Sequence, residues 1–418
     1  MFAPMATICS TSTTKYVLFR ETCKRLQAKN ALSCGLRHHF IVFQALRHTF
    51  KALVRNILQS ETVIFAYGSV SLSQHNIAYM KRKSILTRLF SAVVLTALAT
   101  ACATSHKESS NTDKWVTITN GKLWLTPEGD TVQAHAPGFL RQGNTWYMVG
   151  EDRGHEYNPD VNLYSSTDLQ TWHFVKKIIE NGVTSPELGK NRMIERAKIL
   201  YNPKTRRYIV WCHWEASNYG ASEAACFSSD RIDGEYRLDW SGRPSGIKSR
   251  DCNVFVDNDG TAYFISTTEE NRHLGLFRLS DDYLSTVEHT RLFPEQRREA
   301  PAIVRLGNRY FMLSSACTGW APNQCKLSWS DDLKQGWSDL QPIGDEKAFR
   351  TQPAAILEIR GTKCTTYLYV GDRWKDPTLA ETKTIMFPIT FTDTSCDFRY
   401  RDSFEINFRT GEWRELKP

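Results

Sequence analysis

Five polar side chains recur at equivalent positions along the chain and could together perform acid–base chemistry. They stand at intervals of about 50 residues, each at the start of a short apolar segment, and are His135, Glu195, Asp251, Glu299 and Gln352. Three of them are carboxylates, and neighbouring carboxylates raise one another's pKa values. A carboxyl group with a raised pKa can act as a general acid near neutral pH. One such acid, beside a group that positions or deprotonates water, is the set that cleaves a glycosidic bond.

A second group of polar and aromatic residues follows the next apolar segment of each repeat. If the two segments form an antiparallel hairpin, the second returns to the rim where the first began. Acids, Arg and flat aromatic rings on one rim suit a sugar, because hydroxyls need polar partners and pyranose faces stack on Trp and Tyr. The alternative is that these residues form ordinary ion pairs at strand ends. The predicted substrate-binding residues are His135, Glu151, Tyr219, Trp320, Asp372, Arg373 and Trp374.

The segments that position these residues share a hairpin plan. Each has a short apolar strand, a turn rich in Gly, Asn, Asp or Pro, and a second strand that opens on an aromatic or β-branched residue. The plan begins at Ala136, Ala197, Asn253, Ala300 and Pro353. A third strand ending in a polar turn follows several hairpins. We therefore predict an all-β fold, a five-bladed β-propeller of four-stranded blades, with a β-sandwich as the alternative. The first strand of each blade lines the central channel, so the five polar residues converge there; we call them the hub residues.

Basic residues are concentrated at the N-terminal end of the chain. Residues 1–79 contain nine Lys or Arg against two Glu, and residues 80–102 add four basic residues. Because the whole chain has a formal net charge of +8, the remainder carries −3. That remainder gives no electrostatic reason to expect a nucleic-acid partner, and we expect none.

The composition also divides the chain into segments. All twelve Trp lie at or after Trp115, which indicates where the folded domain begins. Residues 80–102 have the layout of a signal peptide: a basic start at Met80, an apolar run over 91–101 that is too short to span a bilayer, and small residues before Cys102. We expect a spurious or non-structural extension over 1–79, a lipoprotein-type signal peptide over 80–102, a linker over 103–114 and the propeller over 115–418.

Ala99-Thr100-Ala101-Cys102 resembles a bacterial lipobox, in which the Cys is the site of lipidation. The sequence therefore predicts an exported bacterial lipoprotein, periplasmic or at the cell surface, that meets the membrane only through an N-terminal lipid. We expect it to be a monomer. The alternative is a cytoplasmic protein with a basic amphipathic leader.

Seven cysteines follow Cys102, and their pairing stays open because connectivity cannot be deduced from spacing. The chain has no CxxC motif and no His/Cys pair at zinc spacing, so no metal site is expected from them. It also has no GxSxG or P-loop motif, which leaves serine-hydrolase and nucleotide-binding functions without support.

Seven short motifs over about residues 120–375 occur in an order that resembles glycoside hydrolase family 43, and within it the exo-β-1,3-galactanase type. They are Gln133-Ala134-His135, Val149-Gly150-Glu151, Glu195-Arg196-Ala197-Lys198-Ile199-Leu200-Tyr201-Asn202, Ser249-Arg250-Asp251, Arg298-Glu299-Ala300-Pro301-Ala302, Ser315-Ala316-Cys317-Thr318-Gly319-Trp320 and Gly371-Asp372-Arg373-Trp374. The resemblance implies a five-bladed propeller that releases galactose from the chain end of β-1,3-galactan, the arabinogalactan backbone, with inversion.

The resemblance also implies roles for the hub residues. Glu299 is expected to be the general acid, and Asp251 to orient it and modulate its pKa. Ordinary members carry a general-base Asp where this chain has Ala134-His135-Ala136, and the galactanase type lacks that base too. Gln352 is then expected to hold the attacking water, and Glu195 to bind hydroxyls or assist deprotonation.

The resemblance further matches Glu151 and Tyr219 to sugar-binding positions. No cofactor is required, although a structural calcium ion at the hub is possible in this superfamily.

The sequence differs from the exo-β-1,3-galactanase type at three places, so the identity of the sugar that is released stays open. These places are Ala136-Pro137-Gly138, Cys252-Asn253 and Pro353. The alternatives are an α-L-arabinofuranosidase or galactofuranosidase of the same family. A non-catalytic glycan-binding lipoprotein is the alternative from another class, because the usual base is missing.

Overall fold

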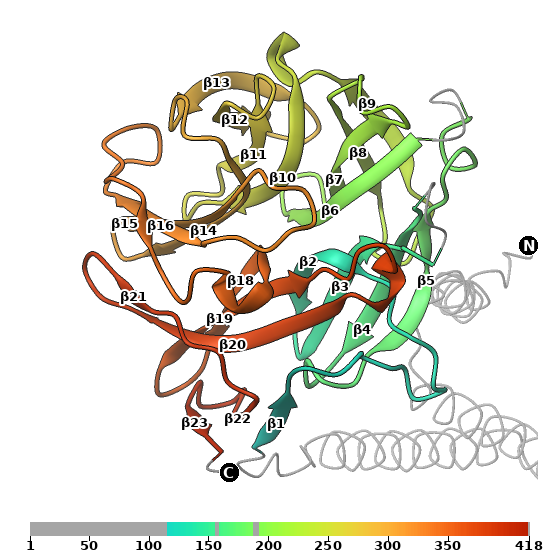
Figure 1. Cartoon of the computed structure of the whole chain (residues 1–418). Coiled ribbons are helices and arrows are strands. Elements are labelled where there is room, and N and C mark those ends of the chain that lie inside the picture. The colour runs from blue at the N-terminus through green and yellow to red at the C-terminus, as the bar shows by residue number, and fades with distance from the viewer. Residues whose placement is uncertain (1–114, 155–158, 187–191, 417–418) are drawn as a thin grey trace, which may run out of the picture. The chain divides into compact units, whose positions relative to one another are not determined.

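The computed structural model describes residues 115–154, 159–186 and 192–416. Within them, five antiparallel four-stranded sheets follow one another along the chain, and a smaller three-stranded sheet joins the two ends (Figure 1). The predicted segments 1–79, 80–102 and 103–114, with Cys102, lie outside the described residues. Among the described residues no helix is long and apolar enough to cross a membrane.

Each four-stranded sheet uses four consecutive strands. The first has β2 (His135–Gln142), β3 (Thr145–Glu151), β4 (Val161–Ser166) and β5 (His173–Ile179). The second has β6 (Arg192–Asn202), β7 (Arg207–Ala216), β8 (Glu223–Ser229) and β9 (Arg237–Gly242). The third has β10 (Ser249–Val256), β11 (Ala262–Thr268), β12 (His273–Leu279) and β13 (Thr286–Leu292). The fourth has β14 (Arg298–Leu306), β15 (Arg309–Ala316), β16 (Lys326–Ser330) and β17 (Gln341–Pro342). The fifth has β18 (Gln352–Arg360), β19 (Thr365–Arg373), β20 (Lys383–Phe391) and β21 (Cys396–Asp397).

The remaining elements are short. β1 (Val116–Thr119) pairs antiparallel with β22 (Ser403–Ile406), which pairs with β23 (Trp413–Glu415), so the start of the described domain is hydrogen-bonded to its end. Short 3₁₀ turns occur as η2 (Pro244–Gly246), η3 (Ala348–Arg350) and η4 (Leu379–Glu381).

The turn residues explain why the predicted hairpins form. β2 and β3 are joined by Gly143-Asn144, and β14 and β15 by Gly307-Asn308. The two glycines have φ of 58° and 59°, in the left-handed region that tight two-residue hairpin turns require and that glycine adopts without a Cβ penalty. The repeated hairpins of the sequence are therefore confirmed.

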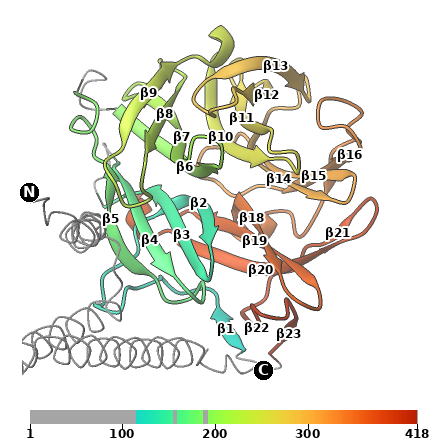
Figure 2. The same ribbon diagram turned by 180° about the vertical axis from the view of Figure 1, so that it is seen from behind.

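The apolar faces of neighbouring sheets pack against one another. One core cluster joins Val149 and Leu163 of the first sheet to Val210 and Phe227 of the second, and similar clusters join each later pair. A further cluster joins Met148 of the first sheet to residues of the fifth, including Val370 and Met386. The last sheet therefore packs against the first, and the sheets surround a common centre (Figures 1 and 2).

The first strand of every sheet lies at that centre, where β2, β6, β10, β14 and β18 contact one another in succession. The register of each shifts at or just after its hub residue. Such bulges bend a strand and change the direction of its side chains. At three of them a non-glycine residue has a left-handed φ, namely Ala136 (45°), Arg196 (53°) and Ala300 (52°). Strain of this kind often accompanies a functional site.

Candidate active site

Glu299 lies at the bulge of β14 with its side chain almost enclosed, since the residue is 8% exposed. Burial is the largest cause that raises its pKa, and the neighbouring negative charge of Asp251 adds to it, so that the pKa reaches about 8. Nε2 of Gln352 donates a hydrogen bond to Oε1 of Glu299 at 3.0 Å. A carboxyl group in this environment is mostly protonated at neutral pH, as a general acid must be.

The amide of Gln352 has only one possible orientation. Nε1 of Trp374 donates to its Oε1 at 2.8 Å, and Nη1 of Arg196 donates to the same oxygen at 3.1 Å. Indole and guanidinium nitrogens act only as donors, so the atom between them must be the amide oxygen. The amide NH₂ group therefore faces Glu299, and it also donates to Oγ of Ser315 at 3.2 Å.

Arg196 connects several of the hub residues, although the sequence did not single it out. Its Nη1 lies 3.4 Å from Oδ2 of Asp251 and donates to Oε1 of Gln352 at 3.1 Å. Its backbone N–H donates to Oε1 of Glu151 at 3.0 Å. Arg196 is 2% exposed, and its backbone has a left-handed φ because it lies at the bulge of β6. The signal available in the sequence was its place directly after a hub carboxylate.

A second charged cluster lies around Glu195. Nη2 of Arg153 is 2.9 Å from Oε1 of Glu195 and is also paired with Glu151, while the hydroxyl of Tyr219 donates to Oε1 of Glu195 at 2.7 Å. Nδ1 of His213 lies 3.0 Å from the other oxygen. Burial alone raises the pKa of Glu195, but the hydrogen bond with His213 and the charge of Arg153 outweigh it and hold that pKa well below its usual range. Glu195 is therefore ionised and a weak base.

His213 itself lies between two carboxylates. Its Nε2 is 3.2 Å from Oε2 of Glu215, and Oε1 of the same carboxylate accepts hydrogen bonds from the backbone N–H groups of Ala221 and Ser222. Burial lowers the pKa of His213, but hydrogen bonds with Glu195 and Glu215 raise it to about 9. At neutral pH the ring is therefore an imidazolium, and it keeps both carboxylates ionised.

The other predicted site residues divide into two groups. His135 is buried, burial lowers its pKa to about 3, and its ring lies 6.2 Å from that of Trp374. Trp320 and Trp374 lie with ring centroids 4.7 Å apart, and Arg153 stacks over Trp320. Trp374 thus lies close to Trp320 and to the hub residues His135 and Gln352.

Asp372 and Arg373 are engaged elsewhere within the fold. Asp372 is 1% exposed and accepts from the backbone N–H of Ala136 at 2.8 Å and from Thr384 at 3.2 Å, so its carboxylate anchors the first bulge. Arg373 donates to the carbonyl of Phe349 at 2.9 Å and stacks over Tyr400.

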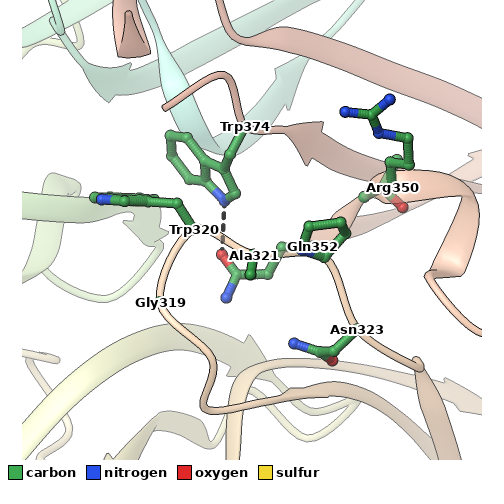
Figure 3. A pocket seen from close by; sticks show the side chains of 9 residues that line it. Gly319, Trp320, Ala321, Asn323, Arg350, Gln352 and Trp374 are labelled. Carbon is green, nitrogen blue, oxygen red and sulfur yellow. Dashed lines mark hydrogen bonds between the residues drawn. The ribbon is translucent and has the colours of Figure 1, made fainter. Parts of the chain in front are cut away.

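A polar pocket opens beside Gln352 (Figure 3). The indoles of Trp320 and Trp374 border it on one side, and the hydrogen bond from Trp374 to Gln352 joins two of its lining residues. Asn323 and Arg350 lie on the other side. Indole rings next to amide and guanidinium groups offer a stacking surface together with hydrogen-bond partners.

Residues 131–350, more than half of the chain, match the family model described as Glycosyl hydrolases family 43. The chain belongs to this family. A glycosyl hydrolase of family 43 cleaves glycosidic bonds with inversion, which agrees with a buried, protonated Glu299. Comparison with curated protein sequences gave no match.

Solved structures of the family are similar to this chain over most of the described part. An exo-β-1,3-galactanase from Clostridium thermocellum is 36% identical, with 72% of this chain and 69% of that chain covered and a TM-score of 0.69. An exo-β-1,3-galactanase from Phanerochaete chrysosporium with galactose is 29% identical, with 72% and 71% covered and a TM-score of 0.68. A family 43 β-1,3-galactosidase with galactodeoxynojirimycin is 30% identical, with 68% and 99% covered and a TM-score of 0.64.

A calcium ion does not fit the candidate ligands at the hub of this family 43 chain. Among the described residues, Glu195, His213 and Asp251 offer ligand atoms within 4.8 Å of one another. Calcium takes oxygen ligands, and His213 contributes an imidazolium whose two nitrogens face carboxylates. We derive no role for a metal from this group.

Lys198, in β6, is a buried residue near the hub residues that the sequence did not predict as part of the site. Its buried Nζ donates to the carbonyls of Ala136, Pro137 and Ala354 at 2.7, 2.8 and 3.1 Å, which ties β6 to β2 and β18. Burial lowers its pKa to about 7. Lys198 therefore stabilises the bulges that position the site. The seven cysteines between residues 115 and 416 are all free thiols in the described structure.

Proposed function

We propose that the protein is an exo-acting, inverting glycoside hydrolase that releases galactose from β-1,3-galactan. The observation that carries the proposal is the buried Glu299, which accepts a hydrogen bond from Gln352 and whose pKa is raised by burial and by the charge of Asp251. The 36% identity to an exo-β-1,3-galactanase supports the choice of substrate. An isolated saccharide-binding surface has no need of a protonated carboxyl group, whereas cleavage of a glycosidic bond depends on one.

The hydrogen bond from Gln352 indicates which oxygen of Glu299 carries the proton. The carbonyl oxygen of a protonated carboxyl group is a better acceptor than its hydroxyl oxygen, so we infer that Oε1 accepts from Gln352 as the carbonyl oxygen and that the acidic proton resides on Oε2. We propose that Oε2 gives this proton to the glycosidic oxygen as the bond breaks. Asp251 and the cation of Arg196 act through Glu299 and Gln352, and orient them.

On the water side, the contacts of Gln352 limit what it can do before substrate arrives. Both of its N–H groups have protein partners, at 3.0 Å to Glu299 and 3.2 Å to Ser315. Inverting enzymes separate the acid and the water-activating group by about 6.5–9.5 Å, which leaves room for the water on the opposite face of the sugar. The bond between Gln352 and Glu299 is much shorter than this separation. We propose that substrate binding breaks this bond and frees an N–H group of Gln352 to hold the attacking water.

Glu195 is proposed as a hydroxyl acceptor rather than as the base. A carboxylate can accept about four hydrogen bonds, so a sugar hydroxyl can join the donors from Arg153, Tyr219 and His213. Tyr219, which is 38% exposed, and the indoles of Trp320 and Trp374 supply the surfaces against which the sugar ring packs.

The five four-stranded sheets support a five-bladed propeller, which we propose as the architecture, because core packing joins the fifth sheet to the first. We also propose that the enzyme is a monomeric exported lipoprotein anchored through Cys102. The composition of residues 80–102 supports this location. Mass spectrometry of the mature protein tests it: an N-terminal peptide that begins before Met80 would contradict it.

The experiment for the activity is product analysis by NMR during incubation with β-1,3-galactan and, in parallel, with arabinofuranoside and galactofuranoside substrates. We expect galactose, released from the galactan first as the α-anomer, because attack from the face opposite a β-linked leaving group inverts the centre. Release of arabinose or of galactofuranose instead would show that the protein is an arabinofuranosidase or a galactofuranosidase of the same family. Binding of galactan without any release would favour a glycan-binding protein, which the absence of a carboxylate at His135 would then explain.

A further inference from the structure

The loop that carries Trp320 is closed by Asn323, a side chain with no part in the mechanism above. This loop joins β15 to β16 over residues 317–325. The backbone N–H of Ala316, the last residue of β15, donates to Oδ1 of Asn323 at 2.8 Å, and Nδ2 of Asn323 donates to the carbonyl of Ala316 at 2.9 Å. The carboxamide thus pairs with both backbone groups of one residue, as a neighbouring antiparallel strand would.

The same carboxamide also fixes the interior of the loop. Nδ2 of Asn323 donates to Oγ1 of Thr318 at 2.7 Å, and that hydroxyl donates to the carbonyl of Ala321 at 2.7 Å. An amide NH₂ group has two N–H donors, and both are used within the loop. Asn323 borders the pocket, but in this form of the loop it has no N–H left for a sugar hydroxyl (Figure 3).

The closed loop places Trp320 against other residues of the site. Gly319, directly before it, has a left-handed φ of 58°, which glycine adopts without a Cβ penalty. The ring centroid of Trp320 then lies 4.7 Å from that of Trp374, and the guanidinium of Arg153 lies over the Trp320 ring at 5.3 Å. The position of this indole therefore depends on the conformation of the loop.

We propose that Asn323 is a positioning residue for substrate binding, because its carboxamide holds the loop so that Trp320 presents its ring to the sugar. The inference rests on the proposed function, in which the indoles of Trp320 and Trp374 supply the surfaces against which the sugar packs. The hydrogen bonds of the Gln352 amide go to residues outside this loop. Loss of the Asn323 contacts should therefore weaken binding and leave the chemical step nearly unchanged.

The first test is steady-state kinetics of two variants with β-1,3-galactan. Asn323→Ala removes all three hydrogen bonds of the carboxamide and should raise KM about tenfold, with kcat within about twofold of the wild type. Thr318→Val removes only the hydroxyl between Asn323 and Ala321, so KM should rise about threefold. Thr318 is exposed, so this variant tests the inference even if Asn323→Ala does not fold.

A second measurement reports the position of Trp320 without substrate. Two indoles in contact couple their electronic transitions and give a paired signal in circular dichroism. The difference spectrum between the wild type and Trp320→Leu isolates the signal of the pair that Trp320 forms with Trp374. The difference spectrum between the wild type and Asn323→Ala should have the same shape.

Asn407→Ala is the matched control. Asn407 is buried, and its Oδ1 accepts two backbone N–H groups at 3.0 Å in the turn after β22, outside the five four-stranded sheets. This variant should lower Tm but leave KM and the dichroism unchanged.

Wild-type KM and dichroism in both loop variants would overturn the inference, and so would a fall in kcat with unchanged KM. A wild type that releases no galactose would instead contradict the proposed function, and the dichroism would still test whether Asn323 places Trp320. The two failures are therefore distinguishable.

Discussion

The replacement Glu299→Gln removes the proposed acid with almost no change in shape. The side chain is enclosed and accepts a hydrogen bond from Gln352 through Oε1, which the carboxamide oxygen of the variant can still accept. The substitution therefore removes the transferable proton and the negative charge that forms when it leaves, while it keeps the volume and the contact.

The environment of Glu299 sets the size of the effect. With a pKa of about 8 instead of 4.5, roughly nine-tenths of the carboxyl groups are protonated at pH 7, against about 0.3% for an ordinary carboxyl group. The fold thus increases the active form roughly 300-fold at that pH. General acid catalysis contributes about 10²- to 10⁴-fold, and we expect kcat/KM for β-1,3-galactan to fall by that factor in the variant.

The assay is initial-rate release of galactose over a pH series. The wild-type kcat/KM should be level near neutral pH and fall as the pH rises through about 8, because the protonated form of Glu299 is then lost. Glu295→Gln is the matched control, since Glu295 is exposed and paired with Arg272, and it should leave the rate unchanged. A Glu299→Gln enzyme within a few-fold of the wild type, or an alkaline limb near pH 5, would refute the assignment of the acid.

Three further predictions follow from the contacts of the site. Asp251→Asn removes a charge that raises the pKa of Glu299, so the alkaline limb should move to lower pH and kcat/KM should fall at least about tenfold; an upward shift would contradict this. Trp374→Phe removes the donor to Oε1 of Gln352, worth about 1 kcal/mol, so kcat should fall about fivefold in steady-state kinetics, and an unchanged kcat would show that the amide needs no such donor. His213 has a folded pKa of about 9 against 6.5 unfolded, so its contribution to stability is complete below pH 6.5 and lost as the pH rises through 9. The Tm of the wild type should therefore decline more over that range than the Tm of His213→Gln, as measured by calorimetry; parallel curves would exclude the imidazolium.

Much of the fold could be predicted from the sequence because its signals are local. Turn residues such as Gly143 and Gly307 are required by the left-handed φ of two-residue hairpins, and each hairpin forms where the sequence placed it. β20 and β21 complete the fifth sheet next to its neighbours along the chain, but β22 leaves that sheet and pairs with β1, an arrangement that depends on where the other end of the domain lies.

The sequence by itself determined which residues stand at the start of the first strands, because the hairpin repeat brings one polar residue of each repeat to the same rim. It thereby predicted that Glu299, Asp251, Glu195 and Gln352 lie near one another. Only the tertiary structure decided their electrostatic states, since these depend on contacts between different sheets. At the bulges, Arg196 contacts both Asp251 and Gln352. Glu299 is enclosed beside Asp251, whereas Glu195 accepts hydrogen bonds from several donors. Two glutamates at equivalent positions thus have pKa values shifted in opposite directions, a difference that arises from burial and partners that no spacing in the sequence records.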